Sequence, residues 1–169
     1  TNDEACALAC AVKEQAGDIT GAEVILCTPA TALSTVAKCV EGSAIEVGAQ
    51  NFFWKDHGAY TGEISAPMLL DLGVDAVILG HSERRQHFGE TDEALARKVR
   101  RAIEAGIEPI LCCGESEEQR ETGDTDAVLS HQVITDLQHA GVLCLDVFPE
   151  DMTAPLVNKY LELKARHLL

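Results

Sequence analysis

The chain has 169 residues, of which 46% are hydrophobic and 24% charged, a composition typical of a folded globular domain rather than a disordered chain. Asp and Glu total 28 against 13 Lys and Arg. The resulting formal charge of −15 repels phosphate backbones, so we expect no nucleic-acid partner. The sequence contains no run of about eighteen apolar residues and no basic, then apolar leader. It therefore predicts neither a membrane partner nor a signal peptide.

Cysteine usage bears on the cellular compartment. The seven cysteines are an odd number and form no C-x-x-C pair, which favours reduced thiols and a cytoplasmic protein over a disulfide framework or a zinc site. Four of them lie in apolar runs that read as buried strands: Cys27, Cys112, Cys113 and Cys144. Cys6 and Cys10 share a helix face, but no His accompanies them at ligand spacing. We interpret them as small hydrophobic residues and expect no metal and no cofactor.

Helical and strand patterns alternate along the chain. Thr1 and Glu4 form a capping-box pattern that opens a helix, and Thr28 with Pro29 predicts the N-cap and first position of the next one. The predicted helices are 1–16, 28–42, 65–72, 91–106, a stretch from 116, and 153–167. The predicted strands are 23–27, 45–49, 74–80, 107–113 and 142–148. Residues 50–65 read as a long loop, and loops of that length usually carry function or an interface.

The strand spacing predicts an α/β fold with a parallel sheet in a single domain, residues 1–169. A doubly wound five-stranded sheet of the flavodoxin type fits this length, whereas a closed eight-stranded barrel usually needs about 200 residues or more. Spacing alone favours the doubly wound sheet. The first strand is followed by Thr28-Pro29-Ala30, however, which lacks the glycine of a phosphate-binding loop.

Ionisable residues concentrate after the most apolar predicted strand. The segment Gly80–Arg85 (GHSERR) follows residues 74–80 directly, where α/β folds place their active sites. If a helical turn begins at Ser82, the helix dipole disfavours imidazolium at His81. A neutral ring can then donate an N–H to a developing oxyanion. A histidine that only caps a turn, with Glu83 paired to a surface arginine, explains the same pattern.

Four motifs, in order along the chain, resemble the triosephosphate isomerase family. They are Gly48–Asn51 (GAQN), Gly58–Ala66 (GAYTGEISA), Val77–Thr91 (VILGHSERRQHFGET) and Ile110–Glu115 (ILCCGE). The resemblance covers about residues 2–138. It implies a (β/α) TIM-barrel type of fold, apparently partial, with about five parallel strands visible, and it outweighs the spacing argument for a doubly wound sheet.

The resemblance also implies roles. The family interconverts dihydroxyacetone phosphate and glyceraldehyde 3-phosphate through an enediolate, and a neutral histidine electrophile is an established feature of it. His81 matches that electrophile, Glu83 its polar neighbour, and Ser82 a residue that holds the ring through the turn. Cys113 matches a structural thiol beneath the site, expected in the core. The implied substrate is a small phosphorylated triose.

The resemblance implies an assembly as well. Residues 58–66 match the family's interdigitating dimer loop, so a homodimer or higher oligomer is expected. Thr61 at the loop tip is implied to reach the partner's active site. Tyr60, Gly62 and Glu63 are implied to pack in the same interface.

Other family features find no match. These are the Asn-x-Lys strand that binds phosphate, the glutamate base with its lid loop, and the glycine-rich phosphate cradle. Residues 139–169 form an atypical C-terminal segment, in which Asp146 and Glu150 read as solvated acids more readily than as the base. The chain therefore looks truncated, and we expect little or no turnover from it alone. A non-catalytic remnant acting by association and a flavodoxin-like binding domain are the alternatives.

Overall fold

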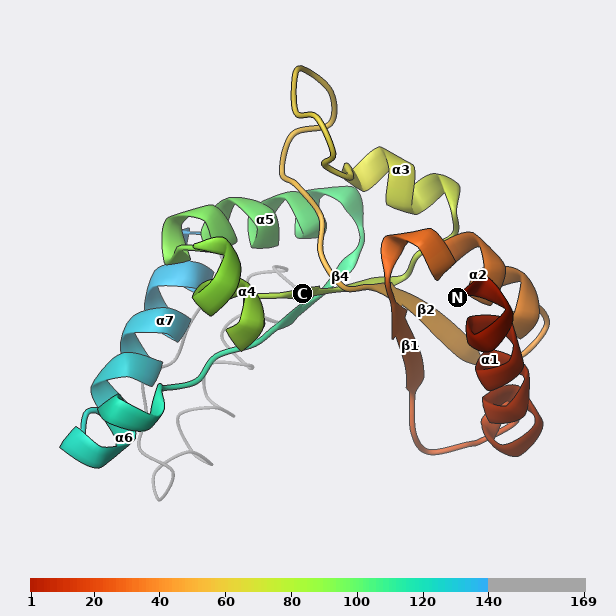
Figure 1. Ribbon diagram of the computed structural model, residues 1–169, viewed down its shortest axis with the longest axis horizontal. Helices are drawn as coiled ribbons and strands as arrows, with labels where there is room; N and C mark the ends of the chain where they lie inside the picture. The colour runs from red at the N-terminus through yellow and green to blue at the C-terminus, as the bar shows by residue number, and fades with distance from the viewer. Residues whose placement is uncertain (140–169) are drawn as a thin grey trace, which may run out of the picture.

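A parallel four-stranded sheet forms the centre of the chain in a computed structural model (Figure 1), which describes residues 1–139. Its strands are β1 (Val24–Thr28), β2 (Ile45–Ala49), β3 (Ala76–Leu79) and β4 (Glu108–Leu111). They lie side by side in chain order, β1-β2-β3-β4. Short apolar runs at the predicted places form each strand, although all but β2 differ by one or two residues at their ends.

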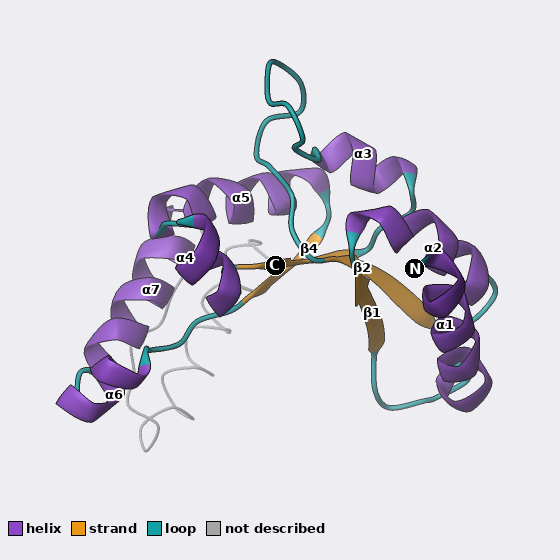
Figure 2. Ribbon diagram, in the orientation of Figure 1, coloured by secondary structure: helices purple, strands orange, loops and turns teal. Residues whose placement is uncertain are grey.

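Helices connect the strands and lie along the outside of the sheet (Figure 2). They are α1 (Asn2–Ala16), α2 (Leu33–Val40), α3 (Ala66–Asp71), α4 (Ser82–Phe88), α5 (Asp92–Ala105), α6 (Glu117–Thr122) and α7 (Thr125–His139). Local capping explains several starts. The predicted capping box of Thr1 with Glu4 forms at α1, and a second one, of Ser116 with Gln119, starts α6.

The order of the strands decides between the two architectures. A doubly wound sheet reverses its strand order at a switch point, and the described sheet runs in sequence without reversal. Sequential parallel pairing is the pattern of a (β/α) barrel wall, so the fold is a partial TIM-barrel type and the flavodoxin-like prediction is wrong. The predicted strand 142–148 and helix 153–167 lie outside the described residues.

Burial is concentrated in the two inner strands. Ala49 of β2 and Val77 and Leu79 of β3 are almost fully buried, together with Leu95 and Val99 of α5. The outer strands β1 and β4 are only half-buried, because within residues 1–139 each pairs with a strand on one side. The prediction of buried cysteines is therefore wrong for Cys27 and Cys112, which are half-buried, and for Cys113, which is exposed.

The predicted N-cap at Thr28 is also wrong. Thr28 is the last residue of β1, and a 3₁₀ turn over Ala30–Ala32 follows before α2 begins at Leu33. Proline at 29 fixes its own φ at −57°, which suits a tight turn as well as a helix start. Within residues 1–139, no helix has both the length and the apolar character that crossing a bilayer requires.

Candidate functional site

His81 lies immediately beyond β3, between the strand and α4. Gly80 makes this turn possible, because its φ of +76° lies in the left-handed region that L side chains disfavour. A Cβ at position 80 would also lie 2.8 Å from the carbonyl oxygen of Cys112. Glycine therefore lets β3 end close to β4 and turn His81 toward the carboxyl edge of the sheet.

The histidine ring is held by the backbone of α4. His81 is the N-cap of this helix, and its Nδ1 accepts a hydrogen bond of 3.3 Å from the backbone N–H of Glu83. Because Nδ1 uses its lone pair to accept, this geometry requires the ring proton to lie on Nε2. In this arrangement Nε2 is the ring nitrogen that is left to donate.

Two neighbours predicted to assist His81 lie close to it. A carboxylate oxygen of Glu83 lies 3.6 Å from His81 Nδ1, and that side chain is 74% exposed. Ser82 is the first residue of α4, between the histidine and the N–H that holds its ring. The hydrogen bond that holds the His81 ring thus comes from the backbone of Glu83. Ser82 occupies the first position of α4, between these two residues.

Arg85 fastens the base of this turn. Its Nε donates to the carbonyl oxygen of Gly80 at 2.9 Å, and its guanidinium also pairs with Asp92 at the start of α5 at 2.5 Å. A longer contact of 3.4 Å reaches the carbonyl of Cys112 after β4. One arginine thereby joins the ends of two strands and two helices, which fixes the loop that carries His81.

A pocket of about 310 Å³ opens beside the histidine. It is lined by Gln50, Asn51, Ile78, His81, Glu83, Arg84 and Phe88. These residues come from the ends of β2 and β3 and from α4, so the pocket lies at the carboxyl edge of the sheet. A larger pocket between Trp54 and α5 shares none of these residues.

A buried polar network beneath this pocket was not predicted from the sequence. Nζ of Lys98, in α5, donates to Asn51 Oδ1 at 2.7 Å and to a carboxylate oxygen of Glu90. Burial lowers the pKa of Lys98, and the hydrogen bond to Glu90 opposes that effect. The other Glu90 oxygen has no hydrogen-bond partner among the described residues. The sequence held one signal for this network, because Lys98 lies among the apolar residues of α5 that face the core.

The predicted interface loop stands out from the rest of the chain (Figure 1). Its base closes where Phe53 N–H donates to the carbonyl of Ile64 at 2.7 Å, and its tip turns where Glu63 N–H donates to the carbonyl of Tyr60 at 3.0 Å. Gly62 allows this turn with a φ of +89°. Tyr60, Thr61, Gly62 and Glu63 are all exposed at the tip.

Two basic residues of α5 hold that loop. Arg101 binds Asp56 through two hydrogen bonds of 2.8 and 3.0 Å, and the guanidinium of Arg97 lies 5.6 Å from the ring centre of Trp54. The loop's shape therefore depends on the barrel's outer helix.

The thiols of Cys6, Cys10 and Cys39 lie together on the outer helices, and this is the group among residues 1–139 with the composition of a metal site. None of the three lines the pocket beside His81.

A family model described as "Triosephosphate isomerase" matches residues 1–146 of the chain. The chain belongs to the triosephosphate isomerase family. Among curated relatives, the triosephosphate isomerase of Alkaliphilus metalliredigens is 50% identical over 127 residues, 75% of this chain and 51% of the relative. That of Rubrobacter xylanophilus is 53% identical over 131 residues, 78% of this chain and 50% of the relative. That of Trichodesmium erythraeum is 54% identical over 115 residues, 68% and 48% respectively.

The chain spans about half the length of the triosephosphate isomerases that it matches. The motif around His81 and the loop at 58–66 both fall within the matched region. Asp146 and Glu150 lie outside the described residues, so their relation to His81 stays a prediction.

Proposed function

We propose that the protein carrying this chain interconverts dihydroxyacetone phosphate and glyceraldehyde 3-phosphate through an enediolate, with His81 as the electrophile. The observation that carries this proposal is the hydrogen bond from the Glu83 N–H to His81 Nδ1 at the carboxyl edge of the sheet. It leaves Nε2–H to donate toward a substrate oxygen in the pocket that His81 lines.

In the proposed reaction, a base removes a proton from the carbon next to the substrate carbonyl. Charge then develops on the carbonyl oxygen, and His81 stabilises it by donating from Nε2. The ring can pass its proton to that oxygen and take one from the neighbouring hydroxyl, which exchanges the two positions. Return of a proton to the other carbon completes the isomerisation.

Glu83 and Ser82 are positioning residues in this proposal. The exposed Glu83 carboxylate places negative charge beside the ring, and Ser82 sets the spacing of the turn. The base is not assigned among residues 1–139. We therefore expect the 169 residues alone to show little or no turnover, because a missing base costs on the order of 10²–10⁴ in rate.

We further propose that the protein forms a homodimer or higher oligomer through residues 58–63. The exposed tip with Thr61 at its end supports this proposal. We also propose a cytoplasmic location, which the unpaired cysteines of the described region favour. A non-catalytic remnant that only associates is the competing function, since it needs the same loop and no base.

The decisive experiment is a chimera. In the Alkaliphilus metalliredigens triosephosphate isomerase, the matched half is replaced by the corresponding segment of this chain, and turnover of glyceraldehyde 3-phosphate is measured. We expect activity, and we expect His81→Gln to lower kcat by about 10²–10⁴. His87→Gln is the matched control, because His87 is exposed on α4 and does not line the pocket.

Two results would count against the proposal. A soluble, folded chimera without turnover would favour the non-catalytic remnant. Equal turnover in the parent chimera and its His81→Gln variant would remove His81 from the chemistry. In the 169-residue chain alone, turnover that His81→Gln abolishes would instead show that Asp146, Glu150 or another acid serves as the base.

A further inference from the structure

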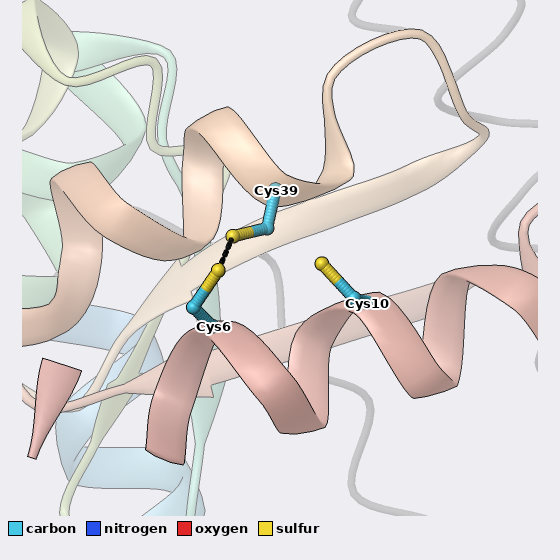
Figure 3. A group of neighbouring side chains, drawn as sticks. All are labelled: Cys6, Cys10 and Cys39. Atoms are coloured by element: carbon cyan, nitrogen blue, oxygen red, sulfur yellow. Dashed lines mark hydrogen bonds between the residues drawn. The ribbon is translucent and has the colours of Figure 1, made fainter. Parts of the chain in front are cut away.

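Three thiols meet where α1 packs against α2 (Figure 3). Cys6 and Cys10 are one turn apart on α1, and Cys39 lies near the end of α2. All three sulfur atoms lie within 4.8 Å of one another. Cys6 Sγ and Cys39 Sγ are 2.6 Å apart, although 33 positions separate them in the sequence.

The short contact favours a bond between two of the sulfurs over a shared metal ion. A disulfide needs an S–S distance of about 2.05 Å, close to the observed approach. Thiolates that share a tetrahedral Zn²⁺ at about 2.3 Å from each sulfur lie roughly 3.8 Å apart, so the pair would have to separate to bind it. The two sulfur atoms thus already approach the distance of a disulfide.

The three thiols differ in access to solvent. Cys10 is exposed, whereas Cys6 and Cys39 are half-buried. The hydrogen bond with Cys6, followed by burial and the nearness of Cys10, raises the pKa of Cys39 to about 12. Since the thiolate is the attacking form, Cys39 is a poor first nucleophile, and the exposed Cys10 is the better point of entry.

We propose that Cys6 and Cys39 form a reversible disulfide between α1 and α2, entered through Cys10 by exchange with a small-molecule disulfide. This inference is independent of the proposed isomerase activity. The Cys10 thiolate attacks the reagent R–S–S–R, forms a mixed disulfide and releases one RS⁻. Cys39 then attacks the Cys10 sulfur, loses its proton and releases the second RS⁻.

Attack of Cys6 on the Cys39 sulfur completes the transfer and returns Cys10 as a thiol. The two protein thiols are thereby oxidised to one disulfide, and the reagent is reduced to two RSH. The bridge ties two helices that otherwise meet by packing and through the hydrogen bond from Lys13 Nζ to the carbonyl oxygen of Glu41. A disulfide reduces the conformational entropy of the unfolded chain. We therefore expect it to raise the midpoint of thermal unfolding by roughly 10 °C.

The test uses hydroxyethyl disulfide on the reduced protein, followed by blocking of free thiols and digestion with trypsin without reductant. Cleavage after Lys13, Lys38 and Lys55 leaves Cys6 and Cys10 on peptide 1–13 and Cys39 on peptide 39–55. We expect these two peptides to be linked. Fragmentation of the linked pair should place the link at Cys6. The link should form more slowly in Cys10→Ser and fall at least tenfold in Cys39→Ser, whereas Cys6→Ser should stop at the Cys10–Cys39 intermediate.

Cys27→Ser is the matched control, because Cys27 lies on β1 outside the three-thiol group, and it should leave the link and its rate unchanged. Mixed hydroxyethyl adducts without linked peptides would overturn the proposal. So would a wild-type link that fragmentation places at Cys10, or one that does not form at all in Cys10→Ser. If the reduced protein bound Cd²⁺ through all three thiolates and gave no linked peptides, the three thiols would form a metal site and the disulfide proposal would be wrong.

Discussion

Lys98 in α5 donates a 2.7 Å hydrogen bond to the side-chain oxygen of Asn51, just beyond the end of β2. The lysine is only 4% exposed, and its other partner, Glu90, is buried as well. This contact links the outer helix to a residue of the candidate pocket. An ion pair far from solvent is thus part of what holds the pocket's wall in place.

Removing the lysine should therefore be costly. Among residues 1–139, Lys98→Met leaves the buried Glu90 carboxylate with the 3.4 Å contact to Arg84, and breaking a buried pair costs about 3–5 kcal/mol. We expect that loss in the free energy of unfolding, measured by urea denaturation. Lys38→Met is the matched control, since Lys38 is exposed on α2, and it should change stability by less than about 0.5 kcal/mol. Equal losses in both variants would contradict the assignment.

The protonation site of His81 can be measured directly. Because Nδ1 accepts from the Glu83 N–H, we expect ¹⁵N NMR of the ring at neutral pH to show the neutral tautomer with its proton on Nε2. His57, on the exposed loop, serves as a reference ring in the same spectrum. A proton on Nδ1, or a doubly protonated ring, would be incompatible with the proposed electrophile.

The loop should loosen in acid. Hydrogen bonds from Arg101 hold the pKa of Asp56 below its ordinary value of 3.8. A carboxyl with a lowered pKa stabilises the folded state fully above its unfolded pKa, and that contribution is lost as the pH falls through the lower folded value. The anchor should therefore hold at neutral pH and fail below about pH 4.

Trp54, the only tryptophan of the chain, reports on this change because it lies beside Arg97 of the same helix. We expect its fluorescence to shift in the wild type as the pH falls below 3.8, the ordinary pKa of an aspartate. Asp56→Asn should show the loosened signal already at neutral pH, whereas Asp71→Asn, at an exposed aspartate of α3, should behave like the wild type. If Asp56→Asn showed the same acid-induced fluorescence shift as the wild type, the contact between Asp56 and Arg101 would not be what holds the loop.

Association should depend on the loop tip. Tyr60 is 41% exposed, and its ring lies 4.7 Å from that of Phe53 at an angle of 45°. A large aromatic side chain in this place can supply the apolar part of a partner interface. We expect light scattering to show a molar mass that rises with protein concentration. Tyr60→Ala should raise the concentration needed for this association at least tenfold. Met68→Ala, at an exposed residue of α3, is the control. A compact monomer at every concentration would refute the proposed oligomer.

Local patterns in the sequence determined most of the secondary structure. The capping boxes at Thr1 and Ser116 and the αL cap at Gly106 depend on residues three or four apart, so the sequence alone contains the interaction. The placement of His81 after an apolar strand was equally local. The exception was Thr28, because the same Thr-Pro pair suits a strand end and a 3₁₀ turn.

The tertiary structure decided the contacts between distant residues. Spacing favoured a doubly wound sheet and the family resemblance opposed it. The pairing of β1 with β2, β2 with β3 and β3 with β4 then excluded it. Cys6 meets Cys39 across 33 positions, Arg101 meets Asp56 across 45, and Lys98 meets Asn51 across 47. No periodicity specifies such pairs, because they depend on how helices pack on the sheet. The sequence by itself therefore determined the elements and the family, and packing determined the network, the loop anchor and the three-thiol group.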